Sequence, residues 1–288
     1  MKKNKQTNKV LVKPFLKWAG GKLRVVDRLE KHFPQGKRFV EPFLGAGSVA
    51  LNVDYPKYIV NDTNADLVAV WKALKENELE FVKSCKKLFC AANNNRQVFD
   101  TLKKEFNTTN DVARKAELFL YLNRHGFNGL CRYNGDGEWN VPFGKNPSPY
   151  FPQEEFEKCL EKVKTFKIMN TDFRKVFELV EPDDVVYCDP PYLPMSQSAN
   201  FDGYSTGGFT LQDHMDLAKC SATAAALGAT VVITNNFNWY SRQIYQNMFG
   251  AKVFKINVAR TISSNIEERK PVEEVIAVFN KEKVAKAA

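Results

Sequence analysis

Short apolar runs alternate with stretches of helical spacing along most of the chain. Runs that end at Gly, Pro, Asn or Asp predict buried strands, and apolar residues at three- and four-residue intervals predict helices. The predicted strands cover 38–41, 57–62, 166–169, 185–188, 230–234, 251–258 and 272–279. The predicted helices cover 25–32, 49–52, 65–76, 97–106, 112–123, 154–163, 211–227 and 239–249, with another short one opened by Thr171 and Asp172.

This order of elements predicts an α/β fold. Strands that alternate with helices favour a mostly parallel sheet, whereas the last two strands, separated only by the polar segment 262–270, predict an antiparallel hairpin at the sheet edge. The region after residue 64 differs, because its predicted helices are joined by polar loops. A turn at 134–137 between the alternating segments 130–133 and 138–141 predicts a β-hairpin there.

Composition narrows the class of protein further. The 288 residues are 44% apolar, which is enough for one large α/β domain carrying a smaller insert. The net charge of +9 favours a polyanionic partner. Six scattered cysteines and three distant histidines suggest neither a disulfide framework nor a metal site, so we expect a reduced, cytoplasmic setting. No apolar run approaches the ~20 residues that a membrane span needs.

The stretch 185–192 combines a buried strand with an unusual end. Two prolines stop the strand at Asp189, because neither Pro190 nor Pro191 offers a backbone N–H, and Tyr192 follows. A carboxylate, free carbonyl oxygens and an aromatic ring suit a planar ring that bears an exocyclic amino group. A proline-stiffened turn without a ligand is the alternative interpretation.

A second corner follows the first predicted strand. Glycines 45 and 47 separate that strand from a helix start, and Asp62 ends the next strand. Such a corner binds nucleosides in doubly wound sheets, where the acid accepts ribose hydroxyls. Ala50 replaces the third glycine of the dinucleotide fingerprint, and a Walker A motif is absent, so an adenosine ligand without a pyrophosphate is favoured.

Three further segments carry candidate chemistry. In 15–22, a Gly-Gly pair lies between Trp18 and Lys22, which suits either a ligand loop or an ordinary turn. Asp172 suits a helix cap or an acceptor for an adenine amino group. The hairpin region suits base edges and phosphates, or else is a solvated hairpin over a small aromatic core. Its polar and aromatic residues are Arg124, Arg132, Asn128, Asn134, Asn140, Phe127, Tyr133 and Trp139.

Five motifs together resemble the Dam family of DNA adenine-N6 methyltransferases, which modify adenine in GATC. They occupy 15–22, 41–48, 120–144, 189–192 and 261–265, and their order is similar to that of the α class of amino methyltransferases. The resemblance implies a Rossmann-like core with S-adenosylmethionine as methyl donor. It also implies a helical target-recognition domain with a β-hairpin at 65–151, inserted into a catalytic domain made of 1–64 and 152–288.

The resemblance further implies a mechanism and a setting. The target adenine would leave the duplex, Asp189 and the Pro190 carbonyl would bind its amino group, and Tyr192 would stack on the ring. We expect double-stranded DNA as the partner, with no metal and no membrane. We also expect a monomer in the cytoplasm of a bacterium, or one encoded by a phage.

Site residues follow from the motif positions. The catalytic residues would be Asp189, Pro190, Pro191 and Tyr192. The cofactor residues would be Trp18, Lys22, Glu41, Phe43, Gly45, Gly47, Ser48, Asp62, Asp172 and Asp189. The DNA-contacting residues would be Lys17, Lys103, Arg124, Phe127, Asn128, Leu130, Arg132, Asn134, Pro142 and Lys145.

Some positions depart from the family pattern. Phe127 stands where many members carry tyrosine, 266–268 replaces a glycine-rich turn, and Lys145-Asn146 replaces an Arg-Tyr pair. That pair is associated in the family with first-base and phosphate contacts, so the resemblance implies discrimination at the inner bases of GATC more firmly than at the outer guanine. Two alternatives remain at this stage: an enzyme acting on RNA or on a protein amide, and a DNA-binding protein without activity. The Gly/Ser-rich segment 195–208 suits a lid or a disordered loop.

Overall fold

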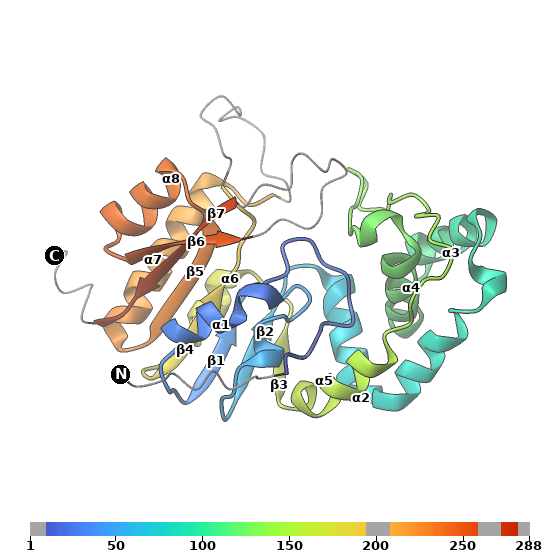
Figure 1. Cartoon of the computed structure of the whole chain (residues 1–288), viewed down its shortest axis with the longest axis horizontal. Coiled ribbons are helices and arrows are strands. Elements are labelled where there is room, and N and C mark those ends of the chain that lie inside the picture. The colour runs from blue at the N-terminus through green and yellow to red at the C-terminus, as the bar shows by residue number, and fades with distance from the viewer. Residues whose placement is uncertain (1–9, 194–207, 259–271, 282–288) are drawn as a thin grey trace, which may run out of the picture.

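The computed structural model describes residues 10–193, 208–258 and 272–281. A sheet with helices on both faces forms one part of the molecule, as Figure 1 shows. Helices α3 (Arg96–Thr108) and α4 (Val112–His125) form a separate group at the other side, joined to the sheet through α2 (Ala65–Lys87).

The sheet has seven strands among the described residues, in the order β3-β2-β1-β4-β5-β7-β6. Strands β1 to β5 pair in parallel, and β7 is antiparallel to both β5 and β6. The predicted parallel sheet with an antiparallel edge hairpin is confirmed, with β7 placed between β5 and β6. The strands are β1 (Arg38–Glu41), β2 (Tyr58–Asn61), β3 (Phe166–Met169), β4 (Asp184–Cys188), β5 (Thr230–Asn236), β6 (Lys252–Val258) and β7 (Val272–Phe279).

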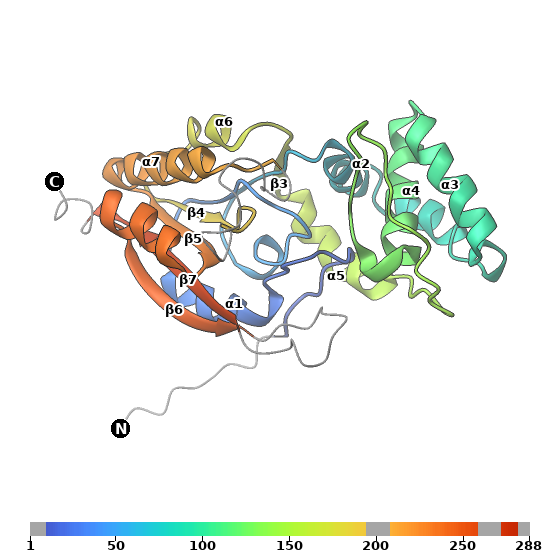
Figure 2. The same ribbon diagram turned by 90° about the horizontal axis from the view of Figure 1, so that it is seen from above.

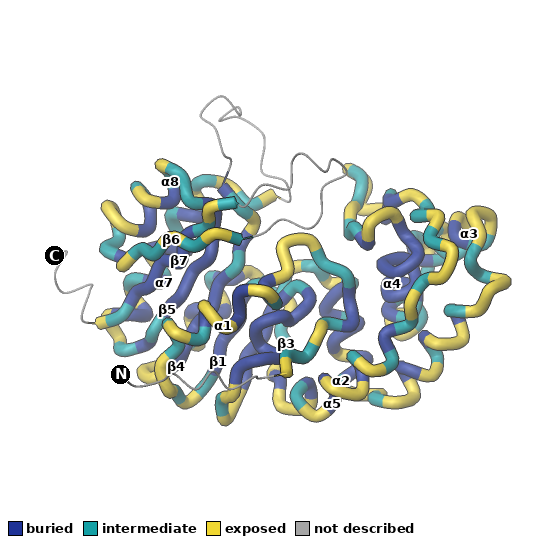
Figure 3. The backbone as a smooth tube through the Cα atoms, in the orientation of Figure 1, coloured by how far each residue is buried: buried dark blue, intermediate teal, exposed yellow. Residues whose placement is uncertain are grey.

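Both faces of the sheet are buried at β1, β2, β4 and β5, which explains why these strands are mostly apolar runs. Neighbouring residues of one strand point to opposite faces, so Phe39 joins one core and Val40 the other. Helices α1 (Val26–Leu29), α2 and α5 (Gln153–Lys164) pack on the first face. Helices α6 (Phe173–Phe177) and α7 (Leu211–Leu227) and the π-helix η6 (Arg242–Met248) pack on the second (Figures 2 and 3).

Helix positions are confirmed, while several of their forms differ from the prediction. Helix α2 continues to Lys87 through a break at Glu78, whose φ is 40°. The predicted helix 239–249 is a three-residue α8 (Trp239–Ser241) followed by the π-helix η6. The predicted helix 49–52 is a single 3₁₀ turn (Ala50–Asn52), and α1 is flanked by 3₁₀ turns.

The predicted hairpin at 130–141 is present only as a single antiparallel bridge between Tyr133 and Trp139. Two backbone hydrogen bonds flank this bridge, from the Asn134 N–H to the Glu138 carbonyl oxygen (2.9 Å) and from the Asn140 N–H to the Arg132 carbonyl oxygen (3.1 Å), so the predicted turn and pairing are confirmed over a shorter length than expected. The Asn107 side chain accepts a hydrogen bond from the Trp139 N–H (2.8 Å) and donates one to its carbonyl oxygen (3.2 Å). The Trp139 N–H and carbonyl point away from Tyr133 at this bridge, so their bonds to Asn107 attach the hairpin to α3. The Trp139 ring is buried against Phe106 and Phe119.

Some sequence-based predictions fall outside the described residues. These are the lid interpretation of 195–208, apart from Gly208, and the interpretations of 261–265 and 262–270. None of the helices that the structure describes is long and apolar enough to cross a membrane.

Candidate active site

The glycine turn after β1 is shaped by two tryptophans. Gly45 and Gly47 have φ values of 50° and 68°, in the left-handed region that favours glycine. A Cβ on Gly45 would lie 2.8 Å from the Trp18 indole nitrogen, and one on Gly47 would lie 2.9 Å from the Trp71 ring. Trp71 also donates a hydrogen bond to the Gly45 carbonyl oxygen (3.1 Å). The turn therefore tolerates no side chain at either glycine.

Asp62 follows β2 and holds the same turn. One of its carboxylate oxygens accepts a hydrogen bond from the Gly45 N–H (2.9 Å), and the other accepts one from the Asn64 N–H (3.0 Å). Burial raises the pKa of this carboxyl, and the backbone donors counteract part of that rise. The ends of β1 and β2 are thus joined through one carboxylate.

Glu41, the last residue of β1, is a buried carboxyl beneath the turn. It accepts a hydrogen bond from the Ala50 N–H (2.9 Å). Burial raises the pKa of Glu41 well above its ordinary value, and the nearby carboxylates of Asp189 and Asp62 raise it further. This carboxyl therefore braces the segment between the strand and the 3₁₀ turn.

Asp189 lies at the end of β4, with a partner on each carboxylate oxygen. The Lys22 ammonium donates to Oδ2 (2.8 Å), and the Thr234 hydroxyl donates to Oδ1 (2.8 Å). The Lys22 side chain is only 5% exposed, and its nitrogen lies 4.8 Å from the centroid of the Tyr192 ring. Removing one partner of a buried ion pair leaves the other charge buried and uncompensated, which is strongly destabilising. The pair therefore fixes the position of the Asp189 carboxylate.

A cavity of about 470 Å³ brings the glycine turn and the Asp189 corner together. Eleven of the predicted site residues line it: Trp18, Lys22, Glu41, Phe43, Gly45, Ser48, Asp62, Asp189, Pro190, Pro191 and Tyr192. Sequence reasoning did not single out several others, namely Ala19, Leu44, Ala46, Val49, Thr63 and Tyr187, and it noted Gly20 and Gly21 only as a loop. Among these residues, only Thr63 could have been expected from the sequence to line the cavity, because it directly follows Asp62.

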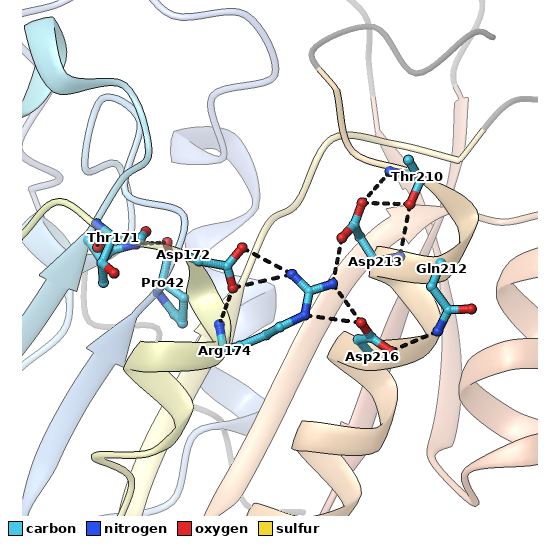
Figure 4. Close-up of polar contacts among 9 residues, drawn as sticks. Pro42, Thr171, Asp172, Arg174, Thr210, Gln212, Asp213 and Asp216 are labelled. Carbon is cyan, nitrogen blue, oxygen red and sulfur yellow. Dashed lines mark hydrogen bonds and ion pairs between the residues drawn. The ribbon is translucent and has the colours of Figure 1, made fainter.

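Gly47 and Asp172 do not line this cavity. Asp172 caps α6 by accepting a hydrogen bond from the Arg174 N–H (2.8 Å), and its carboxylate pairs with the Arg174 guanidinium. That guanidinium also contacts Asp213 and Asp216 of α7, as Figure 4 shows. The structure therefore places Asp172 in a link between two helices.

The predicted DNA-contacting residues differ widely in exposure. Five are exposed: Phe127, Asn128, Arg132, Pro142 and Lys145. Leu130 and Asn134 are half-buried, and Asn134 accepts hydrogen bonds from the N–H groups of Asp136 and Glu138. The Lys103 ammonium pairs with Asp100 within α3. Arg124 instead points inward, and its guanidinium donates to the Phe15 carbonyl oxygen.

Asn123 joins the backbone at Lys17 to the segment after α4 and was not singled out from the sequence. Its amide bonds to both backbone groups of Lys17, at 2.9 Å and 2.8 Å, and to the Gly129 carbonyl oxygen at 3.0 Å. A Cβ on Gly129 would lie 2.4 Å from the Lys17 side chain. An asparagine within the apolar sequence at the end of α4 was the available signal.

These features define a class of protein. At the carboxyl ends of its strands, this sheet carries a glycine turn after β1, an acid after β2, and an aspartate followed by two prolines after β4. This is the arrangement of a Rossmann-like methyltransferase.

The family follows from comparison with known proteins. The model of the D12 class N6 adenine-specific DNA methyltransferases matches residues 18–262, and the chain belongs to this family. It is 41% identical over 266 residues to the DNA adenine methylase of Vibrio cholerae serotype O1, covering 92% of this chain and 95% of that protein. It is 42% identical over 265 residues to the DNA adenine methylase of Escherichia coli K12, covering 92% and 94%.

The predicted resemblance to the Dam family is therefore confirmed, and the chain is an adenine-specific DNA methyltransferase. This assignment decides against both alternatives that the sequence left open, an enzyme acting on RNA or a protein amide and a DNA-binding protein without activity.

Proposed function

We propose that this enzyme transfers a methyl group from S-adenosylmethionine to N6 of the adenine in GATC, after that base has left the duplex. The supporting observation is the single cavity that joins the glycine turn after β1 to Asp189 after β4. One half of the cavity suits a nucleoside, and the other half suits the amino edge of a base.

The residues of the glycine half fit S-adenosylmethionine. When bound, this cofactor supplies a methyl group carried on a positively charged sulfur. The Gly45 backbone packs closely against the Trp18 ring, and both residues line the cavity. Asp62 has about four acceptor sites, and its backbone donors leave room for a ribose hydroxyl. A volume of about 470 Å³ also suits a ligand of this size.

The other half suits adenine. Lys22 and Thr234 each occupy one acceptor site of the Asp189 carboxylate, which leaves further sites for an N–H donor. The Pro190 carbonyl would accept the second amino hydrogen, and Tyr192 would stack on the ring. Binding both hydrogens directs the nitrogen lone pair toward the methyl donor and stabilises the charge that develops during transfer.

The target base has to leave the helix to reach this corner. In a duplex, the adenine amino group is paired and stacked, whereas Asp189 lies in the cavity with a side chain only 20% exposed. Phe127 is 46% exposed and directly follows α4 and Gly126. We infer that it inserts into the stack where the base departs.

We assign sequence reading to residues 65–151, as a domain inserted into the catalytic domain of 1–64 and 152–288. The Arg132 guanidinium is exposed and presents donors suited to the edge of a guanine. Asn128 and Asn134 would contribute amide groups, and Lys145 would contact phosphate. The exposed basic and amide groups of this segment support that assignment.

Methyl transfer to short duplexes tests the proposal. A duplex with one GATC site should be methylated, and a duplex with GTTC in its place should not. Asp189→Ala should lower turnover by about 10³-fold, while equilibrium binding of S-adenosylmethionine stays within about threefold of wild type. The exposed Asp27→Asn is the matched carboxylate control.

Base departure has its own measurement. A duplex carrying 2-aminopurine at the target position should gain fluorescence when the enzyme binds, because unstacking removes quenching.

Equal methylation of the GATC and GTTC duplexes would refute the specificity. Near-normal turnover of Asp189→Ala would refute the assigned role of that carboxylate.

A further inference from the structure

Thr234 is a buried residue of β5 that contacts the catalytic carboxylate without lining the cavity. None of its surface is exposed, and its hydroxyl oxygen lies 2.8 Å from Oδ1 of Asp189. The proposed chemistry depends on that carboxylate and gives the threonine no task of its own. The contacts of this hydroxyl therefore need a separate explanation.

The register of the sheet brings the threonine to this place. Strands β4 and β5 run parallel, and Cys188 pairs with Ile233, so the next residues along the two strands, Asp189 and Thr234, lie side by side. Alternate residues of a strand point to the same face of a sheet, so Tyr187 shares the face of Asp189. Three polar side chains consequently meet on one face, at the carboxyl end of β4.

These three side chains form one chain of hydrogen bonds. The hydroxyl oxygens of Tyr187 and Thr234 lie 2.9 Å apart, and both residues are fully buried. A carboxylate only accepts, so the single hydrogen of the Thr234 hydroxyl is donated to Asp189. The Cys188 carbonyl oxygen, 3.5 Å away, is too distant to compete for it. The Tyr187 hydroxyl is therefore the donor to Thr234.

This chain limits rotation of the Asp189 carboxylate. Lys22 donates to Oδ2 and Thr234 donates to Oδ1, so each oxygen has its own donor. The lysine lies at the end of a long, flexible side chain. The threonine is a β-branched residue with a stiff χ1 angle, in a strand that lies between β4 and β7. The hydroxyl of Thr234 is therefore the more rigid of the two donors.

We propose that Thr234 is a positioning residue for methyl transfer, and that its hydroxyl, held by the Tyr187 hydroxyl, directs the Asp189 carboxylate toward the target amino group. This inference rests on the function proposed above for the corner. A shift of about 1 Å in an accepting oxygen misdirects the nitrogen lone pair and is enough to lower the rate by about 100-fold. Because Thr234 acts through Asp189, its loss should affect the chemical step and leave cofactor binding unchanged.

Two substitutions at residue 234 separate the hydroxyl from its packing. Thr234→Val keeps the branched shape and removes the hydroxyl, whereas Thr234→Ser keeps the hydroxyl. We expect Thr234→Val to lower the single-turnover rate of methyl transfer to a GATC duplex by about 10- to 100-fold. The Kd values of that duplex and of S-adenosylmethionine should change less than about threefold, and Thr234→Ser should retain at least about a third of the wild-type rate.

Tyr187→Phe tests the other bond of the chain. It keeps the ring that lines the cavity and removes the hydroxyl that donates to Thr234. We expect the single-turnover rate to fall by about two- to tenfold. The double variant of Tyr187→Phe with Thr234→Val should match Thr234→Val alone within about twofold, because the tyrosine acts through the threonine. Multiplied losses in the double variant would overturn the assignment of Tyr187 as the donor to Thr234.

The matched control is Ser221→Ala, which removes another buried hydroxyl and its hydrogen bond to the Leu217 carbonyl oxygen (2.7 Å). It should lower the melting temperature without changing the single-turnover rate. A wild-type rate in Thr234→Val, or equal losses in Thr234→Val and Thr234→Ser, would overturn the proposal. A loss that appears only as weaker cofactor binding would overturn it as well. If Thr234→Val does not fold, Tyr187→Phe decides, and a wild-type rate in that variant counts against the chain.

The function proposed for the corner fails in a different experiment, through near-normal turnover of Asp189→Ala. A large loss in Asp189→Ala together with a wild-type rate in Thr234→Val would refute the positioning role alone.

Discussion

The catalytic corner, residues 189–192, and the recognition segment, residues 65–151, differ in how their functional side chains are held. At the corner, Asp189 and the adjoining Leu193 are bound by side chains distant in the chain, and the pairing of Lys22 with Asp189 spans 167 residues. The exposed side chains of the recognition segment bond locally, such as the Arg132 guanidinium, which donates to the Asn140 side chain eight residues away (2.7 Å). The corner is largely buried, whereas Phe127 and Arg132 are exposed.

This difference fits two physical tasks. A methyl transfer needs acceptors held within fractions of an ångström, which buried bonds to several elements provide. A DNA-reading surface has to exchange its bonds with water for bonds to base edges, and weak exposed bonds make that exchange inexpensive. Asn123 joins the recognition segment to the catalytic domain by bonding the Lys17 backbone and the Gly129 carbonyl oxygen.

The buried ion pair gives the largest expected contrast in stability. Lys22→Met leaves the Asp189 carboxylate without its charge partner, and we expect the free energy of unfolding to fall by about 3–5 kcal/mol. Lys83→Met removes an exposed pair with Glu80 and should cost less than about 1 kcal/mol. Urea unfolding measures both variants. Equal losses would contradict the contrast between buried and exposed bonds.

Acid should weaken the catalytic domain and the recognition segment through one buried histidine in each. Burial lowers the pKa of His214 and of His125 to about 4, with Asp213 opposing the shift of His214 and Lys17 adding to that of His125. Both pKa values lie below the unfolded value of 6.5, so this stability is complete above pH 6.5 and is lost as pH falls toward 4.

We expect His214 to account for a loss of about 3 kcal/mol in the free energy of unfolding at pH 4. Urea unfolding between pH 7 and 4 measures it, and His214→Gln should flatten the pH dependence. An identical pH dependence in that variant would show that His214 does not account for this loss.

A substitution at an exposed residue of the recognition segment should change sequence specificity without changing the free energy of unfolding. Arg132→Ala removes exposed donors, so we expect a loss of about 1–3 kcal/mol in discrimination at one guanine of the target. The urea midpoint should stay unchanged, because the bond to Asn140 is exposed. Competition binding with duplexes altered at single bases measures the discrimination. A uniform loss across all sequences would instead identify Arg132 as a phosphate contact.

The sequence by itself determined the strands, most helix positions and the residues of both corners. Strand β1 (Arg38–Glu41) and helix α7 (Leu211–Leu227) were predicted with their observed ends. Periodicity, glycine and proline act over a few residues, so the local sequence contains the information that these elements need.

Only the tertiary structure decided which side chains meet. It paired Lys22 with Asp189, turned Arg124 toward Phe15, and attached the hairpin to α3 through the bonds between Asn107 and the Trp139 backbone. It also paired Arg174 with Asp213 and Asp216 and placed β7 between β5 and β6. These contacts join residues far apart in the chain, and a polar side chain pairs with whichever partner the packed core brings near it, so no local pattern could have predicted them.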